Sequence, residues 1–345
     1  MIINKKIFTV LLTIVASGTT TLQAQNDKEI FEAFNHLDIG VTMGSTGLGI
    51  DIASPFGKYV QVRTGFEIMP RFEKSLHFDI QSFGYNDNGE LQTSQFDKMA
   101  DRLEALTNYR ATPSVEMIGK PTFWNYKLMV DVFPFRNKHW HLTAGFHWGP
   151  AQIAEAVNSL NDAPSLVAVN IYNNLYEKAE SGDPIYNGLA LGTDWLENGR
   201  MGIHVGDYVD RYVMKTVVEY DEYGDFVRSY EDYVLDANGN KVHEPYRMEP
   251  DNNCTVSARV EVNSFRPYLG FGYGGRLLKN DDRYNISFDA GLMFWGGTPA
   301  IITHDGTNLS EDVMNIKGKV GDYVDLISGI KAYPVLNLRI TRRLF

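Results

Sequence analysis

The C-terminal stretch of the chain, Tyr333 to Phe345, reads YPVLNLRITRRLF. Every second residue from Pro334 to Ile340 is apolar, while the residues between them are mostly polar. A period of two with one apolar face is typical of a half-buried β-strand. The signal from one such strand is weak, but the same pattern recurs in seven other segments of the chain.

These seven segments alternate between apolar residues and polar or small ones. Large aromatic side chains lie towards the ends of the apolar faces, as expected where a barrel meets the two surfaces of a membrane. The predicted interface aromatics are Trp124, Trp140, Trp148, Tyr284 and Phe294. The segments are 37–44, 47–54, 59–69, 124–134, 140–148, 267–273 and 284–294.

Backbone groups in lipid must all be paired within the protein, so alternating strands there have to close into a barrel. We therefore predict an all-β fold, an antiparallel transmembrane β-barrel of eight strands. Ten strands is the alternative, because 76–83 and 203–213 also read as strands, although we place both outside the membrane. No run of 18 apolar residues follows Gln25, so no transmembrane helix is expected.

The N-terminus has the composition of a secretory signal peptide. Lys5 and Lys6 precede an apolar run from Phe8 to Ala16, and small and polar residues follow. This run is too short to span a bilayer as a helix. We predict a signal peptide at 1–25 and a barrel domain at 36–345, located in the cell outer membrane.

The charge of the chain is strongly acidic. Its formal net charge is −11, and loss of the signal peptide would remove two lysines and no acid. Such a surface argues against nucleic acid as a partner. Cys254 is the single cysteine, so no internal disulfide can form. Neither a metal site nor a cofactor is predicted.

The predicted connections differ greatly in length. Those at 54–58, 135–139 and 276–283 are short, whereas 70–123, 149–264 and 295–332 are long. Transmembrane barrels keep their periplasmic turns short and their extracellular loops long. We therefore predict that 149–264 is an extracellular α+β insertion and that any partner binds there. Helices are expected at 94–106 and 153–160.

A short repeat marks this insertion. Asp221 to Gly224 and Asp236 to Gly239 lie fifteen residues apart, and both read as tips of β-hairpins. Tyrosines surround the first tip in an acidic context. They could bind a protein or glycan, or simply form the exposed side of a hairpin. The candidate surface-binding residues are Tyr220, Tyr223, Tyr230 and Tyr233.

Four stretches together resemble the exported outer-membrane β-barrel proteins of Bacteroides-type bacteria. They are LDIGVTMGSTGLGIDIASPFGKYVQVRTGF (37–66), NYKLMVDVFPF with HWHLTAGFHWGP (125–135 and 139–150), RPYLGFGYGGRLLKNDDRYNISFDAGLMFWGGTP (266–299) and YPVLNLRITRRLF (333–345). The resemblance implies an outer-membrane barrel, in contact with lipid and folded with the barrel-assembly machinery. It implies no activity. The chain departs from the common pattern at Phe345, which lies one residue beyond the apolar face.

Charged residues collect on the inward faces of the predicted strands. One interpretation is a selectivity lining or a proton relay. The other, which we favour, is a neutralised plug, because an eight-stranded barrel is just wide enough to be filled by its own side chains. The predicted lumen cluster is Asp38, Asp51, Arg63, Glu67, Lys127, Asp131, Asp289 and Arg339, with Arg276 as a further candidate.

The sequence is compatible with three functions. The first is a non-enzymatic barrel with a structural or surface-binding role through its long loops. The second is a small channel, which requires more strands or an open lumen. The third is a lipid-modifying enzyme, for which Ser287, His147 and Asp289 would have to converge near the outer rim. His141 and His147 lie too far apart along one strand to share a metal.

Overall fold

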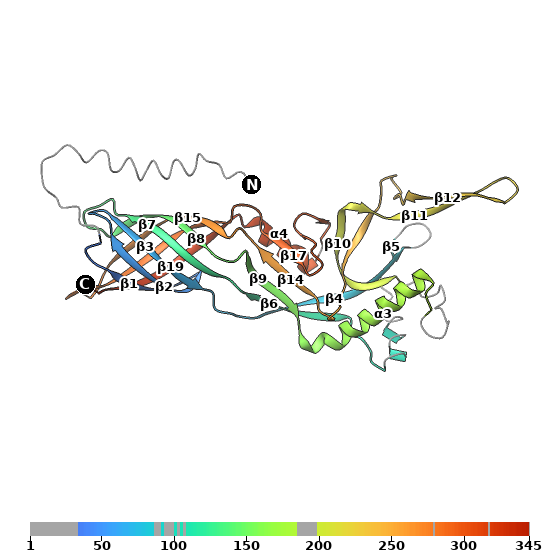
Figure 1. Ribbon diagram of the computed structural model, residues 1–345, viewed down its shortest axis with the longest axis horizontal. Coiled ribbons are helices and arrows are strands. Elements are labelled where there is room, and N and C mark those ends of the chain that lie inside the picture. The colour runs from blue at the N-terminus through green and yellow to red at the C-terminus, as the bar shows by residue number, and fades with distance from the viewer. Residues whose placement is uncertain are drawn as a thin grey trace.

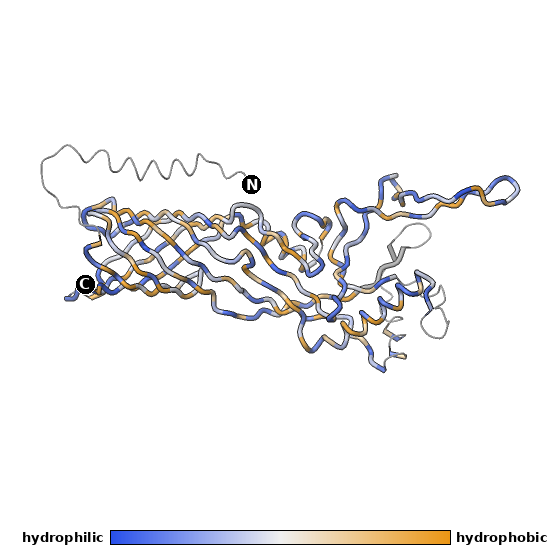
Figure 2. The backbone as a smooth tube through the Cα atoms, in the orientation of Figure 1, coloured by the Kyte–Doolittle hydropathy of each residue, from blue (hydrophilic) through white to orange (hydrophobic). Residues whose placement is uncertain are grey.

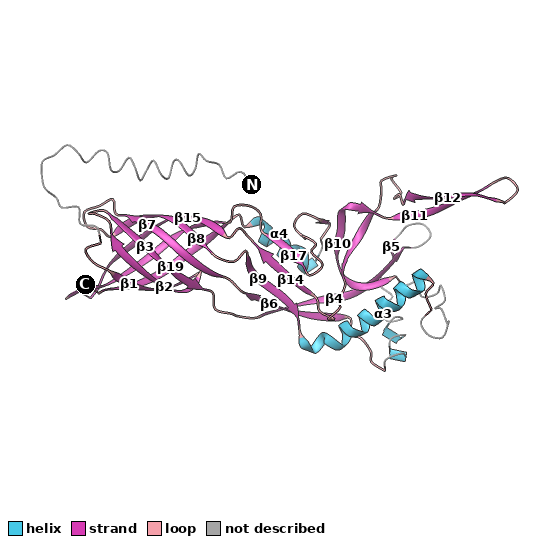
Figure 3. Cartoon of the chain, viewed as in Figure 1, coloured by secondary structure: helices cyan, strands magenta, loops and turns pink. Residues whose placement is uncertain are grey.

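The computed structural model describes residues 34–85, 91–92, 100–101, 104–105, 108–184, 199–278, 280–316 and 318–344. They form a closed β-barrel whose wall continues at one end into an open sheet (Figures 1 and 3). We call this second part, residues 69–123, 149–264 and 295–331, the cap. The predicted signal peptide at 1–25 lies outside the described residues, as does Phe345.

The barrel has eight antiparallel strands, as predicted. Each strand pairs with the next along the chain, and the first and last strands pair to close the barrel. The strands are β1 (Asp38–Gly44), β2 (Gly47–Pro55), β3 (Val60–Ile68), β7 (Trp124–Val132), β8 (Trp140–Trp148), β15 (Phe265–Leu278), β16 (Asp281–Phe294) and β19 (Ala332–Arg343). The ten-strand alternative is wrong, because the two extra segments are cap strands.

Alternation along β19 follows the sequence pattern. Val335, Asn337 and Arg339 are buried inside the barrel, while Leu336 and Leu338 are exposed on its outer surface. Apolar and polar residues alternate in the same way around the barrel wall (Figure 2). The period of two therefore fixes which face of each strand points inward.

The short connections lie at the end of the barrel opposite the cap. They join β2 to β3, β7 to β8 and β15 to β16. The last is shorter than the predicted 276–283, because both strands extend beyond the wall and pair as far as Leu278 and Asp281. The tight turn at Ser45 and Thr46 lies at the cap end, between β1 and β2.

The cap sheet is built from all three long connections. It runs in the order β13-β10-β4-β6-β9-β14-β17, with β5 on β4 and β18 on β10. The segment 149–264 therefore shares one sheet with 70–123 and 295–332, and the cap is wider than the predicted insertion. The strands are β4 (Lys74–Tyr85), β5 (Leu91–Gln92), β6 (Ser114–Pro121), β9 (Gln152–Asn158), β10 (Arg200–Tyr212), β13 (His243–Met248), β14 (Ser257–Glu261), β17 (Ala300–Thr303) and β18 (Val313–Met314).

Five strands of the barrel wall pass into this sheet without changing neighbours. The barrel order β3-β7-β8-β15-β16 becomes the cap order β4-β6-β9-β14-β17, with two to five residues between each pair of strands. The cap is thus an extension of one side of the wall, as the elongated outline in Figure 1 shows.

Helices also contribute to the core of the cap. Helix α3 (Ala163–Ser181) follows the short helix η1 (Leu160–Asp162), and Gly182 ends it in a left-handed conformation with φ 70°. Leu166 and Tyr172 of α3 join a buried cluster with Met201 of β10. Val324 of α4 (Gly318–Gly329) belongs to the same cluster. No helix among the described residues is long and apolar enough to cross a membrane.

The predicted helix at 153–160 is wrong, because most of this segment is strand β9. Its residues Ile153 to Val157 suit a helix by composition, but β6 and β14 pair with them on both sides. Pairing with flanking strands outweighs the weak local preference for a helix. The side chains on which the predicted helix at 94–106 depends lie outside the described residues.

An exposed hairpin projects from the cap. Strands β11 (Met214–Tyr220) and β12 (Phe226–Tyr233) pair only with each other among the described residues, and they extend away from the sheet (Figure 1). Asp221 begins its tip by accepting hydrogen bonds from the backbone N–H groups of Tyr223 and Asp225. The second predicted tip repeats this arrangement at Asp236.

The repeat has a third member that the sequence pattern concealed. Asp251, fifteen residues after Asp236, accepts hydrogen bonds from the N–H groups of Asn253 and Thr255. Gly224 and Gly239 adopt positive φ in the first two turns, and Cys254 takes this position in the third with φ 56°. The first two turns could be predicted from a glycine three residues after the aspartate. The third turn has cysteine at this position, so the pattern did not reveal it.

Candidate functional site

The barrel lumen holds all eight residues of the predicted lumen cluster. Each is at most 6% exposed, whereas Arg276 is exposed at the short-turn end of β15. Five of the eight are acidic and three are basic, so these eight residues do not neutralise one another by themselves. They are buried because they occupy inward-facing positions of strands whose residues alternate between the two faces, namely β1, β2, β3, β7, β16 and β19.

Three cations pair with four of these acids, in two groups that together we call the lumen network. Arg63 lies 3.0 Å from Asp131 and 3.2 Å from Asp289. Lys127 Nζ lies 2.7 Å from Glu67 and 3.3 Å from Asp51. Removing these charges from water is costly, and the attraction of an opposite charge close by offsets that cost.

The third cation, Arg339, belongs to the same group as Lys127, because both contact Asp51. Its Nε and Nη2 both donate to Asp51 Oδ1, at 2.8 and 2.6 Å. At the end of the barrel, Asp38 lies 3.7 Å from Arg343. The network therefore crosses the lumen between strands far apart in the sequence.

An apolar layer lies beside this network in the lumen. Met129, Tyr268, Met293 and Val335 are each at most 5% exposed and form one cluster with Trp295. Between the two layers remains a cavity of about 10 Å³, lined by residues such as Arg63 and Tyr268. A cavity of this size holds about one water molecule. Around this cavity the buried side chains of the described residues occupy the lumen.

The three residues considered for a hydrolase site do not meet. Asp289 is bound by Arg63 and by His141, whose Nε2 lies 2.6 Å from Asp289 Oδ1. His147 Nε2 instead lies 3.5 Å from Glu67. Ser287 pairs with Gly274 and His147 with Arg266 on β15, so eight positions of that strand separate them.

The outer surface of the barrel is a broad apolar belt. Residues such as Val41, Ile50, Leu269 and Leu336 are 50–64% exposed there. Soluble proteins rarely expose a continuous apolar surface of this extent. Four of the five predicted interface aromatics are exposed, and Tyr284 is half-buried.

These aromatics lie at both ends of the belt. Trp124 and Trp148 pack edge to face at the cap end, with ring centroids 6.0 Å apart. Trp140 packs on Tyr273 at the other end, at 4.9 Å. Eight residue steps of about 3.3 Å separate the two tryptophans of β8, which suits the ~25 Å apolar band of a membrane barrel.

The four candidate tyrosines all belong to the β11–β12 hairpin, but they differ in their surroundings. Tyr220 and Tyr223 are 63% and 83% exposed at the tip. Tyr230 donates to Glu219, and the Tyr233 ring faces Lys241 Nζ at 3.5 Å. Three of the four are thus exposed, and Tyr233 packs against Lys241.

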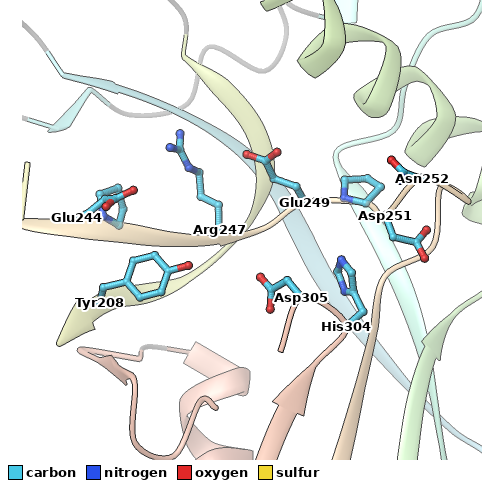
Figure 4. A pocket seen from close by; sticks show the side chains of 10 residues that line it. Tyr208, Glu244, Arg247, Glu249, Asp251, Asn252, His304 and Asp305 are labelled. Atoms are coloured by element: carbon cyan, nitrogen blue, oxygen red, sulfur yellow. The ribbon is translucent and has the colours of Figure 1, made fainter. Parts of the chain in front are cut away.

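A cleft of about 480 Å³ in the cap was not predicted from the sequence. Its walls come from β10, β13, the turn that begins at Asp251 and the connection after β17 (Figure 4). These segments carry no shared motif, and the polar side chains resemble those of any loop. The lining residues are Tyr208, Glu244, Pro245, Arg247, Glu249, Pro250, Asp251, Asn252, His304 and Asp305.

Hydrogen bonds from the surrounding cap hold the carboxylates of the cleft in place. Arg200 donates two hydrogen bonds to Glu249, at 2.9 and 2.7 Å. Asp305 accepts from the buried Tyr246 and Thr303. Burial alone would raise the pKa of Asp305, but hydrogen bonds from Thr303, Thr307 and Tyr246 lower it below its ordinary value. This carboxylate therefore stays ionised.

The tyrosines at the cleft stay protonated. Burial raises the pKa of both Tyr208 and Tyr246. Figure 4 shows the Tyr208 hydroxyl directed towards the middle of the cleft. The guanidinium of Arg211 lies over the Tyr208 ring, 4.0 Å from its centroid, and fixes the ring. Tyr208 can therefore donate a hydrogen bond from a set position.

Comparison with solved structures finds six similar chains, among them the following three. CarO2 of Acinetobacter baumannii is 12% identical, with 90% of this chain and 99% of that chain covered and a TM-score of 0.35. CarO of the same organism is 11% identical, with 89% and 97% covered and a TM-score of 0.35. A major outer membrane protein from Thermus thermophilus is 10% identical, with 90% and 98% covered and a TM-score of 0.26.

No family model matches the chain, and no curated protein matches it. The fold assignment therefore rests on the strand pairing itself, which closes eight antiparallel strands into a barrel.

Proposed function

We propose that this protein is an integral outer-membrane barrel of the Bacteroides type that does not conduct and that displays a ligand-binding cap outside the cell. The barrel acts as a membrane anchor. The apolar belt supports contact with lipid, and the aromatic side chains at its two ends support a transmembrane orientation. The four stretches that resemble this family cover most of each of the eight barrel strands.

The filled lumen carries this proposal. The ion-pair network and the apolar layer leave a cavity of about 10 Å³ inside the barrel, whereas the cap holds a cleft of about 480 Å³. A continuous aqueous path would require the buried charges around Arg63 to separate and the Met129 layer to move. Eight-stranded barrels of this width are generally filled by their own side chains.

Reconstitution in planar bilayers tests the anchor role. We expect no conductance above the background of the protein-free bilayer at either polarity, because no water column crosses the lumen. Protein that shifts in apparent size on boiling in a detergent gel provides the control for a folded barrel. Reproducible, ion-selective conductance steps from that folded material would instead identify a channel.

A further inference from the structure

We propose that the cap cleft binds an uncharged, hydroxyl-rich glycan. This inference deepens the proposed function and rests on it, because the cleft has to face the outside of the cell to meet such a ligand. The cleft volume of about 480 Å³ lies within the ~300–1,000 Å³ typical of ligand sites. Its lining is polar on every wall, which does not suit an apolar ligand.

The lining offers both hydrogen-bond acceptors and donors. Glu244, Asp251 and Asp305 supply carboxylate oxygens, while Asn252 and the Tyr208 hydroxyl supply donors. A sugar hydroxyl donates one hydrogen bond and accepts up to two, so a glycan can match both kinds of group. A ligand that only donates, such as an ammonium ion, would leave the donors of the cleft unmatched.

The acceptors are preorganised. Asp251 Oδ1 accepts two backbone N–H groups, at 2.9 and 2.7 Å, and Arg200 fixes Glu249 through two hydrogen bonds. Thr303 Oγ1 holds Asp305 at 2.5 Å. A ligand that binds side chains already fixed in position loses less conformational entropy on binding.

The charge of the cleft selects among glycans. It contains four carboxylates and one guanidinium, so an acidic sugar would be repelled. Among the described residues no group of acidic, histidine or cysteine side chains could hold a metal ion, and the carboxylates are spread around the walls. Figure 4 shows this spacing, with Glu244 on β13, Glu249 directly after it and Asp305 opposite them. An extended polar ligand can therefore contact several of them together.

Two residues outside the cleft provide a matched control. Asp225 and Glu231 lie on the β11–β12 hairpin and are exposed, and neither lines the cleft. The pair Asp225→Asn and Glu231→Gln removes the same charge as Glu244→Gln and Asp305→Asn. A difference between the two double variants therefore reports on the cleft and not on the net charge.

The test uses the full-length protein in detergent micelles, probed with an array of uncharged gluco-, manno-, galacto- and fructo-oligosaccharides. We expect at least one to bind, and we expect the Glu244→Gln/Asp305→Asn variant to weaken it at least about tenfold in calorimetric titration. The hairpin double variant should bind as the wild type does. Asn252→Ala, an exposed change at the rim of the cleft, should also weaken binding if the double variant folds poorly.

Three outcomes would overturn the proposal. One is a heat-modifiable, folded barrel that binds none of these saccharides. Another is a saccharide whose binding neither cleft variant changes. The third is polylysine binding that the cleft variant abolishes, which would make the cleft a site for basic peptides. Each of them leaves the anchor role standing, since that role is decided by conductance and membrane fractionation.

Discussion

Arg63 joins two carboxylates from different strands across the lumen. It is 5% exposed and lies within 3.2 Å of both Asp131 and Asp289. We expect Arg63→Met to lower the free energy of unfolding by roughly 3–5 kcal/mol, because two buried carboxylates lose their cation. Urea unfolding of the protein in micelles, followed by tryptophan fluorescence, measures the change.

The control for this variant is Arg276→Met, at an exposed position of the same barrel. We expect it to alter the free energy of unfolding by less than about 0.5 kcal/mol. Equal stability of the Arg63 variant and the wild type would show that the lumen network does not hold the barrel together.

Gly272 gives a steric prediction at the same scale. A Cβ atom at this position would collide with His141 Nε2 and Asp289 Oδ1, which are in contact with each other. We expect Gly272→Ala to destabilise the barrel by roughly 1–3 kcal/mol, as overpacking does in a filled interior. Gly297→Ala is the control, since no heavy atom lies within 4 Å of its added Cβ. A thermal melt monitored by gel mobility compares the two variants, and matching midpoints would contradict the steric argument.

Single residues also show which features of the site could be predicted from the sequence. All eight predicted lumen residues are buried, because the period of two assigns each to a face without reference to its neighbours. The partners of each charge could not be assigned, since Arg63 and Asp289 meet only after the barrel has closed. The residues of the cleft carry no periodic signal, and they are brought together by the folding of the whole cap.

Among the elements, the β11–β12 hairpin has the fewest supporting contacts. Both strands are largely exposed, and they pair only with each other within the described part of the chain. We expect replacement of 214–233 by a short Gly-Ser linker to leave the barrel folded, with a melting midpoint within about 2 °C of the wild type, because this part contributes nothing to either core. Calorimetry of the variant in micelles tests this. A barrel that no longer assembles would mean that the hairpin supports the cap.

Barrel strands could be predicted because they alternate between lipid-type and lumen-type residues along their whole length. The cap strands could not be ordered in the same way, since their two faces are less different. Strand β9 was mistaken for a helix because its alanines and glutamate suit both structures, and only β6 and β14 decide between them.

For the whole molecule, the arrangement predicts which side of the membrane each part faces. All three long connections leave the barrel at one end, together with the tight turn at Ser45 and Thr46, and the other three short connections lie at the opposite end. We expect protease added to intact cells to cut between Tyr220 and Lys241 and to spare the barrel strands, because barrels carry their long loops outside. Mass spectrometry of the fragments locates the cuts. Cleavage that appears only after the outer membrane is broken would invert the topology.

The passage of five wall strands into the cap has a mechanical consequence. A pulling force on the cap acts parallel to the strands that join it to the barrel, such as β3 with β4 and β16 with β17. Such a load acts in shear on many backbone hydrogen bonds together, whereas a tethered domain would peel them apart one by one. Force applied to the cap is therefore transmitted to the barrel through continuous, hydrogen-bonded β-strands.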